Sequence, residues 1–445
     1  MTKWLVSLRT PTAYKKPIQP ANMPIAGGNL VQSRESPLKN DHRPIPVQAD
    51  RMLADLQTIR QFGACGNGVV RRAYSENDIA SRVWLADRME KAGLEVSVDA
   101  MGNVFGIPPG DGPCLLLGSH TDTQPEGGWL DGVYGVIVAL EVARASIEAG
   151  GPRIACVSFQ DEEGSFTPLT GSRVWTGSLA QEIADTLVDD AGTPLAVARQ
   201  KRGALPAARE VSPSLFSGFI EMHIEQGPVL DRTGEKIGVV DSIVGIRGQR
   251  ITFTGEQNHA GTTPMQMRRD AFQGMVRFVT RLNDRFKDIV GPTTVWTIGQ
   301  ASVHPNATSI VPGKVDFWVQ WRDGDDALLD RMHEIIDATA VDIASEMQLA
   351  CEITSYSKIA PTLCSPAYIA AMSEAAEARA PGRWRVMPSG ALHDAANVSM
   401  HMPMGMMFVP SINGISHNFD EDTAVPDLEI GLEVFAEAIA RIAAG

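Results

Sequence analysis

The stretch that organises this sequence is residues 114–163, CLLLGSHTDTQPEGGWLDGVYGVIVALEVARASIEAGGPRIACVSFQDEE. Its two short apolar runs, CLLLGSH and RIACVSF, are typical of strands that are buried on both faces. Between them, residues 133–149 have the pattern of a helix. A strand, a loop, a helix and a second strand predict an α/β sheet, in which functional side chains stand where strands end. His120 and the pair Glu162–Glu163 occupy these two ends.

The same pattern continues on both sides of this stretch. Upstream, we expect helices over residues 51–61 and 76–93 and two strands around a turn at Gly102–Asn103. Downstream, the apolar run SGFIEMHIEQG leads into His223. From residue 361 the α/β pattern returns, with a helix over 366–379, a strand MGMMFVP and a closing amphipathic helix over 427–444.

Between these parts, residues 245–360 follow a different order. Strand GQRITFTG, a helix from Pro264 to Val290, strands TTVWTIGQASV and KVDFWVQWRD, a second helix and strand ACEITSYSKI predict the order β-α-β-β-α-β. That order is a ferredoxin-like sandwich. We therefore predict a disordered tail over 1–48, a mixed-sheet α/β catalytic domain over 49–244 and 361–445, and an inserted α+β dimerisation or lid domain over 245–360.

Composition excludes several classes of protein. The chain has 445 residues, which favours two domains, and 44% hydrophobic with 21% charged residues indicates a globular protein. A net charge of −14 argues against a nucleic-acid partner, and no apolar run is long enough to span a membrane. Five scattered cysteines favour reduced thiols in a cytoplasmic protein. The acid-free first 34 residues could be a transit peptide, but a tail is the simpler interpretation.

Acidic and imidazole side chains follow the predicted strands or lie in Gly-rich loops. A two-metal hydrolase needs such ligands, one carboxylate shared between the ions, and a free carboxylate that accepts a proton from water. Any one of these residues alone has a commoner structural explanation, but their joint order predicts a metal centre. The candidates are His120, Asp122, Asp131, Glu162, Glu163, His223 and His417.

Several motifs resemble the hydantoinase/carbamoylase branch of the aminoacylase and carboxypeptidase-type metallohydrolases. They are GSHTDTQPEGGWLDGVYGV, DEEGS, HIEQGPVL, NHAGTTPM with RRDA, HDA and VPSINGISHN. The resemblance runs from about Arg51 to the C-terminus. It implies that His120 and His223 bind one metal ion, that Asp131 bridges, and that Glu163 and His417 complete a second site. Glu162 would be the general base, and Asp122 would fix the tautomer of His120. Two Zn²⁺ ions are expected, with Mn²⁺, Co²⁺ or Ni²⁺ as alternatives.

The resemblance also implies substrate contacts. His259 would polarise the scissile carbonyl in the partner subunit of a homodimer, and Asn306, Arg322, Gly390, Ala391 and His393 would bind the substrate carboxylate or support its site. Taken without the resemblance, Asn306 could be a turn residue and Arg322 a surface charge. Arg247 could contact substrate or form a structural ion pair. Leu392 stands where relatives often have Gly, which puts the choice of substrate in doubt.

The implied reaction is hydrolysis of the carbamoyl amide of an N-carbamoyl amino acid to amino acid, carbon dioxide and ammonia. Allantoate and N-carbamoyl-β-alanine are alternative substrates, because they also combine a ureido group with a carboxylate. An aminoacylase or dipeptidase and a non-catalytic metal-binding scaffold are remoter alternatives.

Overall fold

The computed structural model describes residues 43–445 of the chain. The predicted tail over 1–48 therefore lies largely outside the described residues. Residues 43–48 precede the first helix, α1 (Ala49–Arg60), and have no regular secondary structure.

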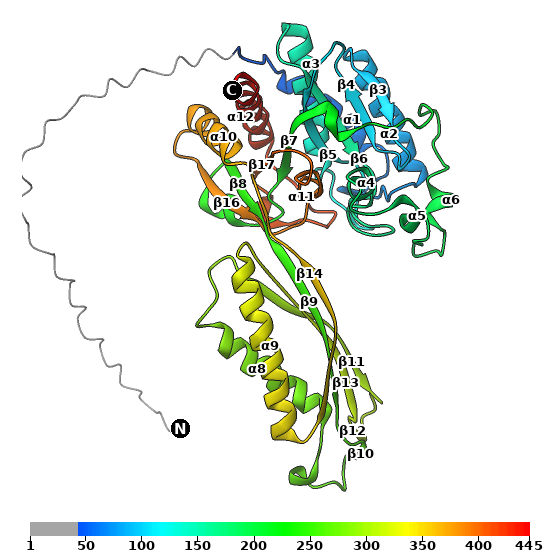
Figure 1. Cartoon of the computed structure of the whole chain (residues 1–445), viewed down its shortest axis with the longest axis vertical. Coiled ribbons are helices and arrows are strands. Elements are labelled where there is room, and N and C mark those ends of the chain that lie inside the picture. The colour runs from blue at the N-terminus through cyan, green and yellow to red at the C-terminus, as the bar shows by residue number, and fades with distance from the viewer. Residues whose placement is uncertain (1–42) are drawn as a thin grey trace, which may run out of the picture. The chain divides into compact units, whose positions relative to one another are not determined.

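A nine-stranded mixed sheet organises the parts of the chain on either side of residues 245–360 (Figure 1). Its strand order is β15-β8-β17-β7-β5-β6-β4-β3, and β16 also pairs with β8. Its strands are β3 (Glu95–Val98), β4 (Val104–Ile107), β5 (Cys114–His120), β6 (Ile154–Phe159), β7 (Phe216–Ile224), β8 (Ile237–Ile243), β15 (Thr362–Leu363), β16 (Trp384–Ser389) and β17 (Met404–Val409). The four neighbours β17, β7, β5 and β6 are mutually parallel, so their carboxyl ends lie at one edge.

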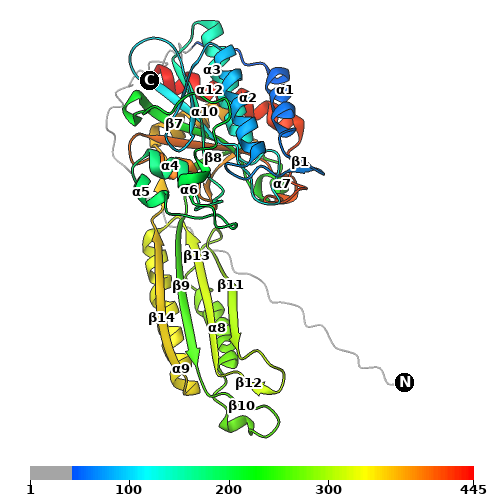
Figure 2. The same cartoon turned by 90° about the vertical axis from the view of Figure 1, so that its right-hand side faces the viewer.

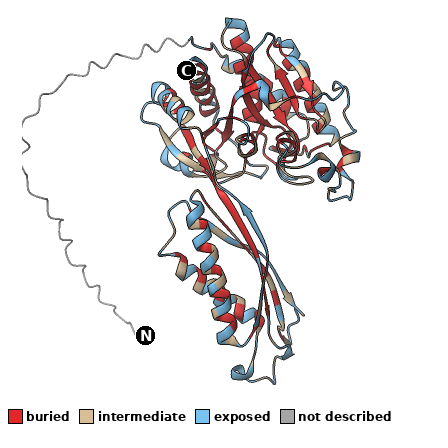
Figure 3. Ribbon diagram, viewed as in Figure 1, coloured by how far each residue is buried: buried red, intermediate tan, exposed pale blue. Residues whose placement is uncertain are grey.

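Two apolar cores pack against this sheet. Figure 3 shows most of its central strands coloured as buried. One core contains side chains of α1, α2 (Glu76–Lys91), α3 (Val133–Ala149), α10 (Pro366–Arg379) and α12 (Val425–Ala444). The other contains side chains of α11 (Asp394–Val398) packed with Phe105, Phe159 and Phe219. Residues of β5 and β6 are buried throughout, which explains why these strands read as continuous apolar runs.

Residues 245–360 form a second, four-stranded antiparallel sheet of order β11-β13-β9-β14. The strands are β9 (Gly245–Thr254), β11 (Val295–His304), β13 (Lys314–Asp323) and β14 (Ala350–Ile359). Helices α8 (Ala271–Phe286) and α9 (Asp326–Met347) pack on one face, which Figure 2 shows behind the strands. This is the predicted ferredoxin-like order. A two-stranded ribbon of β10 (Asn258–His259) and β12 (Ile310–Val311) follows at one end.

The mixed-sheet α/β fold is confirmed, but both ends of one helix are wrong, since the helix predicted over Pro264–Val290 spans Ala271–Phe286. The helix predicted from Pro264 begins only at Ala271, because the Asp270 carboxylate caps it by accepting N–H groups of Phe272 and Gln273. Residues Met265–Met267 form the 3₁₀ turn η2 instead.

Several elements had not been predicted. Among them are strands β8, β15 and β16, the hairpin of β1 (Ala64–Cys65) and β2 (Gly68–Val69), and short helices and turns. The latter are α4 (Thr170–Trp175), α5 (Gln181–Ala184), α6 (Leu195–Ala198), α7 (Val229–Thr233), η1 (Pro213–Leu215) and η3 (Ile412–Gly414).

All five cysteines lie within residues 43–445, and none of them pairs with another in a disulfide. None of the helices in the described part of the chain combines the length and hydropathy that crossing a bilayer requires.

Candidate metal centre

Four adjacent parallel strands bring the candidate ligands to one edge of the large sheet. His120 ends β5, His223 lies near the end of the neighbouring β7, and Glu162 and Glu163 follow β6. His417 follows β17 on the other side of β7. Asp131 stands in the loop that leads into α3. Residues almost 300 positions apart in the chain thus meet because parallel strands share their carboxyl ends.

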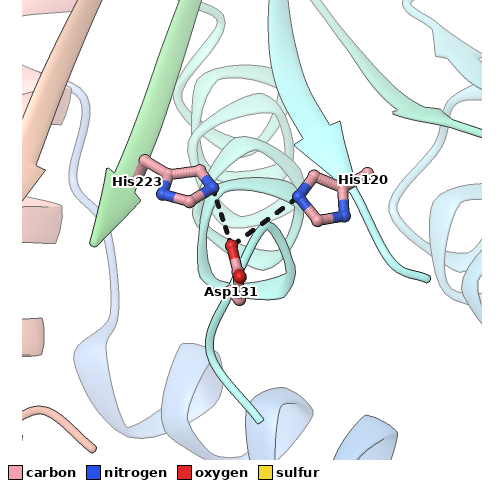
Figure 4. Close-up of side chains that lie close together, drawn as sticks. All are labelled: His120, Asp131 and His223. Carbon is pink, nitrogen blue, oxygen red and sulfur yellow. Dashed lines mark ion pairs between the residues drawn. The ribbon is translucent and has the colours of Figure 1, made fainter. Parts of the chain in front are cut away.

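The first group consists of His120, Asp131 and His223, all buried, whose ligand atoms lie within 4.8 Å of one another. In Figure 4 the Asp131 carboxylate lies between the two imidazole rings. Oδ1 of Asp131 is 3.2 Å from Nε2 of His223 and 3.8 Å from Nε2 of His120. Gly132 allows this approach, since a Cβ there would lie 2.3 Å from Nε2 of His120.

Main-chain carbonyls orient both imidazoles toward Asp131. Nδ1 of His120 lies 3.1 Å from the carbonyl oxygen of Asp122, and Nδ1 of His223 lies 2.9 Å from that of Ile224. Each Nδ1 therefore carries the proton and donates it, which leaves Nε2 of each ring as the nitrogen that can bind a metal ion. Nε2 of His223 also accepts the main-chain N–H of Gly132 at 3.2 Å.

The second group consists of Asp131, Glu163 and His417. The other oxygen of Asp131, Oδ2, lies 3.3 Å from Nε2 of His417, and Oε2 of Glu163 lies 3.5 Å from the same nitrogen. The side chain of His417 is 50% exposed, so this group faces the solvent side of the pocket. Asp131 is common to both groups and presents a different oxygen to each.

Asp122 contacts both His120 and the loop after β6. Its main-chain carbonyl, rather than its carboxylate, accepts the His120 hydrogen bond, and its Oδ1 is 3.7 Å from Nδ1 of His120. The carboxylate accepts the main-chain N–H groups of Glu162 at 3.3 Å and Glu163 at 3.1 Å. Asp122 therefore orients the β6 loop as well as His120.

Negative charge accumulates in this pocket. Burial, then the facing Glu163 and Asp394, raise the pKa of Glu162 well above its usual range. Burial and Asp131 do the same to the pKa of Glu163. Burial opposes protonation of His223, yet the Asp131 carboxylate raises the pKa of that imidazole to about 9. A cation bound at Nε2 would take the place of that proton, because protons and metal ions compete for one lone pair. The donor set therefore fits divalent ions.

The pocket extends from these ligands to the second sheet. It has a volume of about 220 Å³, and its apolar lining residues are Pro168, Leu169, Ile246, Ala391 and Leu392. Arg322, near the end of β13, also lines it and is half-buried. Its hydrogen bonds go to neutral oxygens, namely Oε1 of Gln320 and the carbonyl of Gly390.

His393 also lines this pocket and contacts His223, with ring centroids 4.7 Å apart. Its Nε2 is 2.9 Å from Oγ of Ser389, which in turn accepts the N–H of Ala391. Burial lowers the pKa of His393 well below its usual value, so the ring is neutral. His393 thus supports the loop that contains Gly390 and Ala391. Arg247 is fully buried and pairs with Asp326 and Asp330, which makes it a structural residue.

Two predicted substrate residues, His259 and Asn306, do not lie at this pocket. Both stand at the end of the four-stranded sheet opposite Arg322, since His304 pairs with Lys314 and Lys314 with Thr254. β9 has ten residues, and its length separates this end from Gly245 by about 30 Å. Figures 1 and 2 show β10 at this far end.

Three polar side chains at the centre were not predicted. Gln124 donates to Oε2 of Glu163 at 2.6 Å, and Gln226 donates to Oδ2 of Asp131 at 3.0 Å. Glu421 accepts the main-chain N–H of Asp131. Gln124 lies inside the motif GSHTDTQPEGGWLDGVYGV and Gln226 inside HIEQGPVL, so both positions could have been found from the motifs. Glu421 lies three residues after the motif VPSINGISHN.

This fold, with a carboxylate shared by two ligand groups at strand ends, defines a metallohydrolase class. Residues 116–441 match Peptidase family M20/M25/M40, and the chain belongs to this family.

Similar proteins indicate the branch of this family to which the chain is related. An N-carbamoyl-L-amino-acid amidohydrolase from Paenarthrobacter aurescens is 36% identical, over 87% of this chain and 96% of the relative. An allantoate amidohydrolase from Escherichia coli K12 is 34% identical over the same shares. A solved amidase of the hydantoinase/carbamoylase family from Burkholderia phymatum is 40% identical, with a TM-score of 0.84 over 90% of this chain and 98% of that one. The resemblance stated from the motifs is confirmed, and with it the prediction of an amidohydrolase.

Proposed function

We propose that this chain is a two-metal amidohydrolase that cleaves the carbamoyl amide of an N-carbamoyl amino acid. The observation that carries the proposal is the position of Asp131, whose Oδ1 faces His223 at 3.2 Å and whose Oδ2 faces His417 at 3.3 Å. A carboxylate shared between two cation sites is the central requirement of two-metal hydrolysis.

His120, His223 and Asp131 would hold one ion, and Asp131, Glu163 and His417 the other. Zn²⁺ is the expected ion because imidazole and carboxylate donors suit it, and Mn²⁺, Co²⁺ and Ni²⁺ are alternatives because such mixed donors discriminate weakly. When bound, the ions would supply Lewis acidity to the scissile carbonyl and to the attacking water.

Glu162 is the proposed general base. It lines the same pocket, with its Oε2 3.6 Å from Nε2 of His120, and belongs to neither ligand group. Bound cations would offset the burial and the neighbouring carboxylates that raise its pKa, and would so let its carboxylate take a proton from water. The water oxygen then bonds to the ureido carbon, and Glu162 returns the proton to the amino-acid nitrogen as its bond to that carbon breaks. The products are a free amino acid and carbamic acid, which decomposes to carbon dioxide and ammonia.

Arg322 is the proposed partner of the substrate carboxylate. Its guanidinium has neutral oxygens as hydrogen-bond partners, and burial lowers its pKa. A half-buried cation with neutral partners is suited to a bidentate contact with a carboxylate. Gly390, whose carbonyl oxygen accepts a hydrogen bond from Arg322, and its neighbour Ala391 would approach the same carboxylate.

We further propose a homodimer in which His259 and Asn306 of one subunit complete the pocket of the other. Their distance from their own pocket supports this arrangement. Nδ1 of His259 accepts N–H groups of Gly261 at 3.0 Å and Thr262 at 3.2 Å, so its proton lies on the outward Nε2. That tautomer can donate a hydrogen bond to a carbonyl oxygen. A cytoplasmic location remains a prediction from the cysteines.

Allantoate is the second candidate substrate, because the relative from Escherichia coli that is 34% identical is named an allantoate amidohydrolase. The test is release of ammonia and amine by the metal-loaded protein from N-carbamoyl-α-amino acids, N-carbamoyl-β-alanine, allantoate and an N-acetyl amino acid. We expect the highest kcat/KM on an N-carbamoyl-α-amino acid. Turnover restricted to the N-acetyl compound would contradict the proposal. A higher kcat/KM on allantoate would mean that allantoate, rather than an N-carbamoyl amino acid, is the substrate.

A further inference from the structure

Glu421 connects the two parts of the chain that carry Asp131 and His417. It stands between η3 and α12 and is 1% exposed. Its Oε1 accepts the main-chain N–H groups of Leu130 at 3.3 Å and Asp131 at 3.0 Å. Its Oε2 accepts the hydroxyl of Ser416 at 2.9 Å. One carboxylate therefore joins the peptide that bears the shared Asp131 to the residue before His417.

The neighbouring backbone is shaped around this carboxylate. A Cβ at Gly128 would lie 1.9 Å from Oε1 of Glu421 and 2.1 Å from its Cδ, so only glycine permits the contact. On the other side, His417 has a φ of +52°, a conformation that costs free energy for a residue with a side chain. The bond from Ser416 to Glu421 lies directly beside this unfavourable backbone position.

We propose that Glu421 is a positioning residue that holds Asp131 and His417 at the separation that the second metal site requires. The inference rests on the proposed two-metal function, since it takes Asp131, Glu163 and His417 as the ligands of one ion. Glu421 itself would not touch the ion or the substrate. It acts through the main-chain N–H of Asp131 and through Ser416. The first site also contains Asp131 but depends on Glu421 less, because main-chain carbonyls of Asp122 and Ile224 orient its other two ligands, His120 and His223.

The test is the metal content of full-length variants after dialysis against limiting Zn²⁺, measured by elemental analysis, with the unfolding temperature measured alongside. Substitution of a residue that orients a metal ligand typically lowers the affinity for the metal ion 10- to 100-fold. We expect Glu421→Ala to retain one ion per chain and to bind the second about 10- to 100-fold more weakly. Glu421→Gln keeps an oxygen for the two N–H groups and an amide N–H for Ser416, so it should restore most of the second-site affinity.

Asp420→Ala is the matched control, because Asp420 lies next in the same loop and accepts from Asn67 rather than from the Asp131 or His417 segments. It should retain both ions. If Glu421→Ala does not fold, Ser416→Ala and Gly128→Ala test the two sides of the contact separately, and both should weaken the second ion selectively.

Full binding of both ions by Glu421→Ala, or by both substitute variants, would overturn the inference. So would equal loss of both ions in a variant with a lowered unfolding temperature, because that pattern means a general structural role. A wild-type chain that binds no metal would instead refute the proposed function itself.

Discussion

Nη1 of Arg322 donates a hydrogen bond to the carbonyl oxygen of Gly390 over 3.0 Å. This bond joins β13 of the four-stranded sheet to the loop after β16 of the large sheet, at the pocket that contains the metal ligands. The proposed carboxylate partner therefore reaches the pocket from the predicted insert, and its exact position depends on both sheets.

Arg322→Ala should weaken carboxylate substrates strongly. Loss of a buried charged contact costs about 2–5 kcal/mol, expressed here as a fall in kcat/KM. An amide-capped N-carbamoyl substrate has no carboxylate to lose and should be affected much less. Arg250→Ala is the control, since Arg250 lies on the same sheet but pairs with Asp316. An equal loss on both substrates would mean that Arg322 is structural.

Removal of metal should abolish turnover. The pocket gathers Glu163 and three imidazoles around the shared carboxylate of Asp131. A chelator should therefore remove ions that the reaction needs. Readdition of Zn²⁺, Mn²⁺, Co²⁺ or Ni²⁺ to the dialysed protein should restore activity in proportion to bound ion, measured by elemental analysis. A fully active preparation without bound metal would refute the proposal.

Glu162→Gln and Glu163→Gln should fail in different ways. Glu162 belongs to neither ligand group, so its Gln variant should keep both ions and lose kcat by at least about 10²-fold. Glu163 lies 3.5 Å from Nε2 of His417, so its Gln variant should lose second-site metal first. Metal content and kcat are measured for both proteins. The opposite pattern would show that the two roles are exchanged.

Co-expression of Glu162→Gln with His259→Ala should recover activity that neither homodimer has. If His259 acts in the partner's pocket, a heterodimer contains one site with an intact Glu162 and an intact His259. Its activity should reach up to about half that of the wild type if the sites are independent. Heterodimers are purified through two different affinity tags before the assay. An inactive, verified heterodimer would show that each His259 serves its own subunit.

Leu392→Ala should shift preference toward bulkier substrates. Leu392 lines the pocket beside Ala391, and its truncation enlarges the apolar wall. The substitution removes three carbons, and a single methylene in a hydrophobic pocket is worth about 1–3 kcal/mol of discrimination. The ratio of kcat/KM for large and small N-carbamoyl amino acids measures the effect. If this kcat/KM ratio is unchanged, the substrate side chain does not contact Leu392.

Local patterns were enough to predict much of the fold. The apolar runs that became β5 and β6 are buried along their whole length, so hydrophobicity alone identified them. The helix after Pro264 was placed too early because its start depends on one side-chain contact, the capping of α8 by Asp270. Strand β8 was not predicted, although its run IGVVDSI has the same apolar character.

The sequence by itself determined which chemical groups stand at strand ends, because a buried strand and the residue that follows it are a local pattern. His120, His223 and the pair Glu162–Glu163 were found in this way. Only the tertiary structure decided that Asp131 presents one oxygen to each ligand group, that Glu421 ties its backbone to the His417 loop, and that His259 lies a strand's length from its own pocket. These relationships depend on contacts between residues up to 290 positions apart, which strand pairing and packing create and no local pattern encodes.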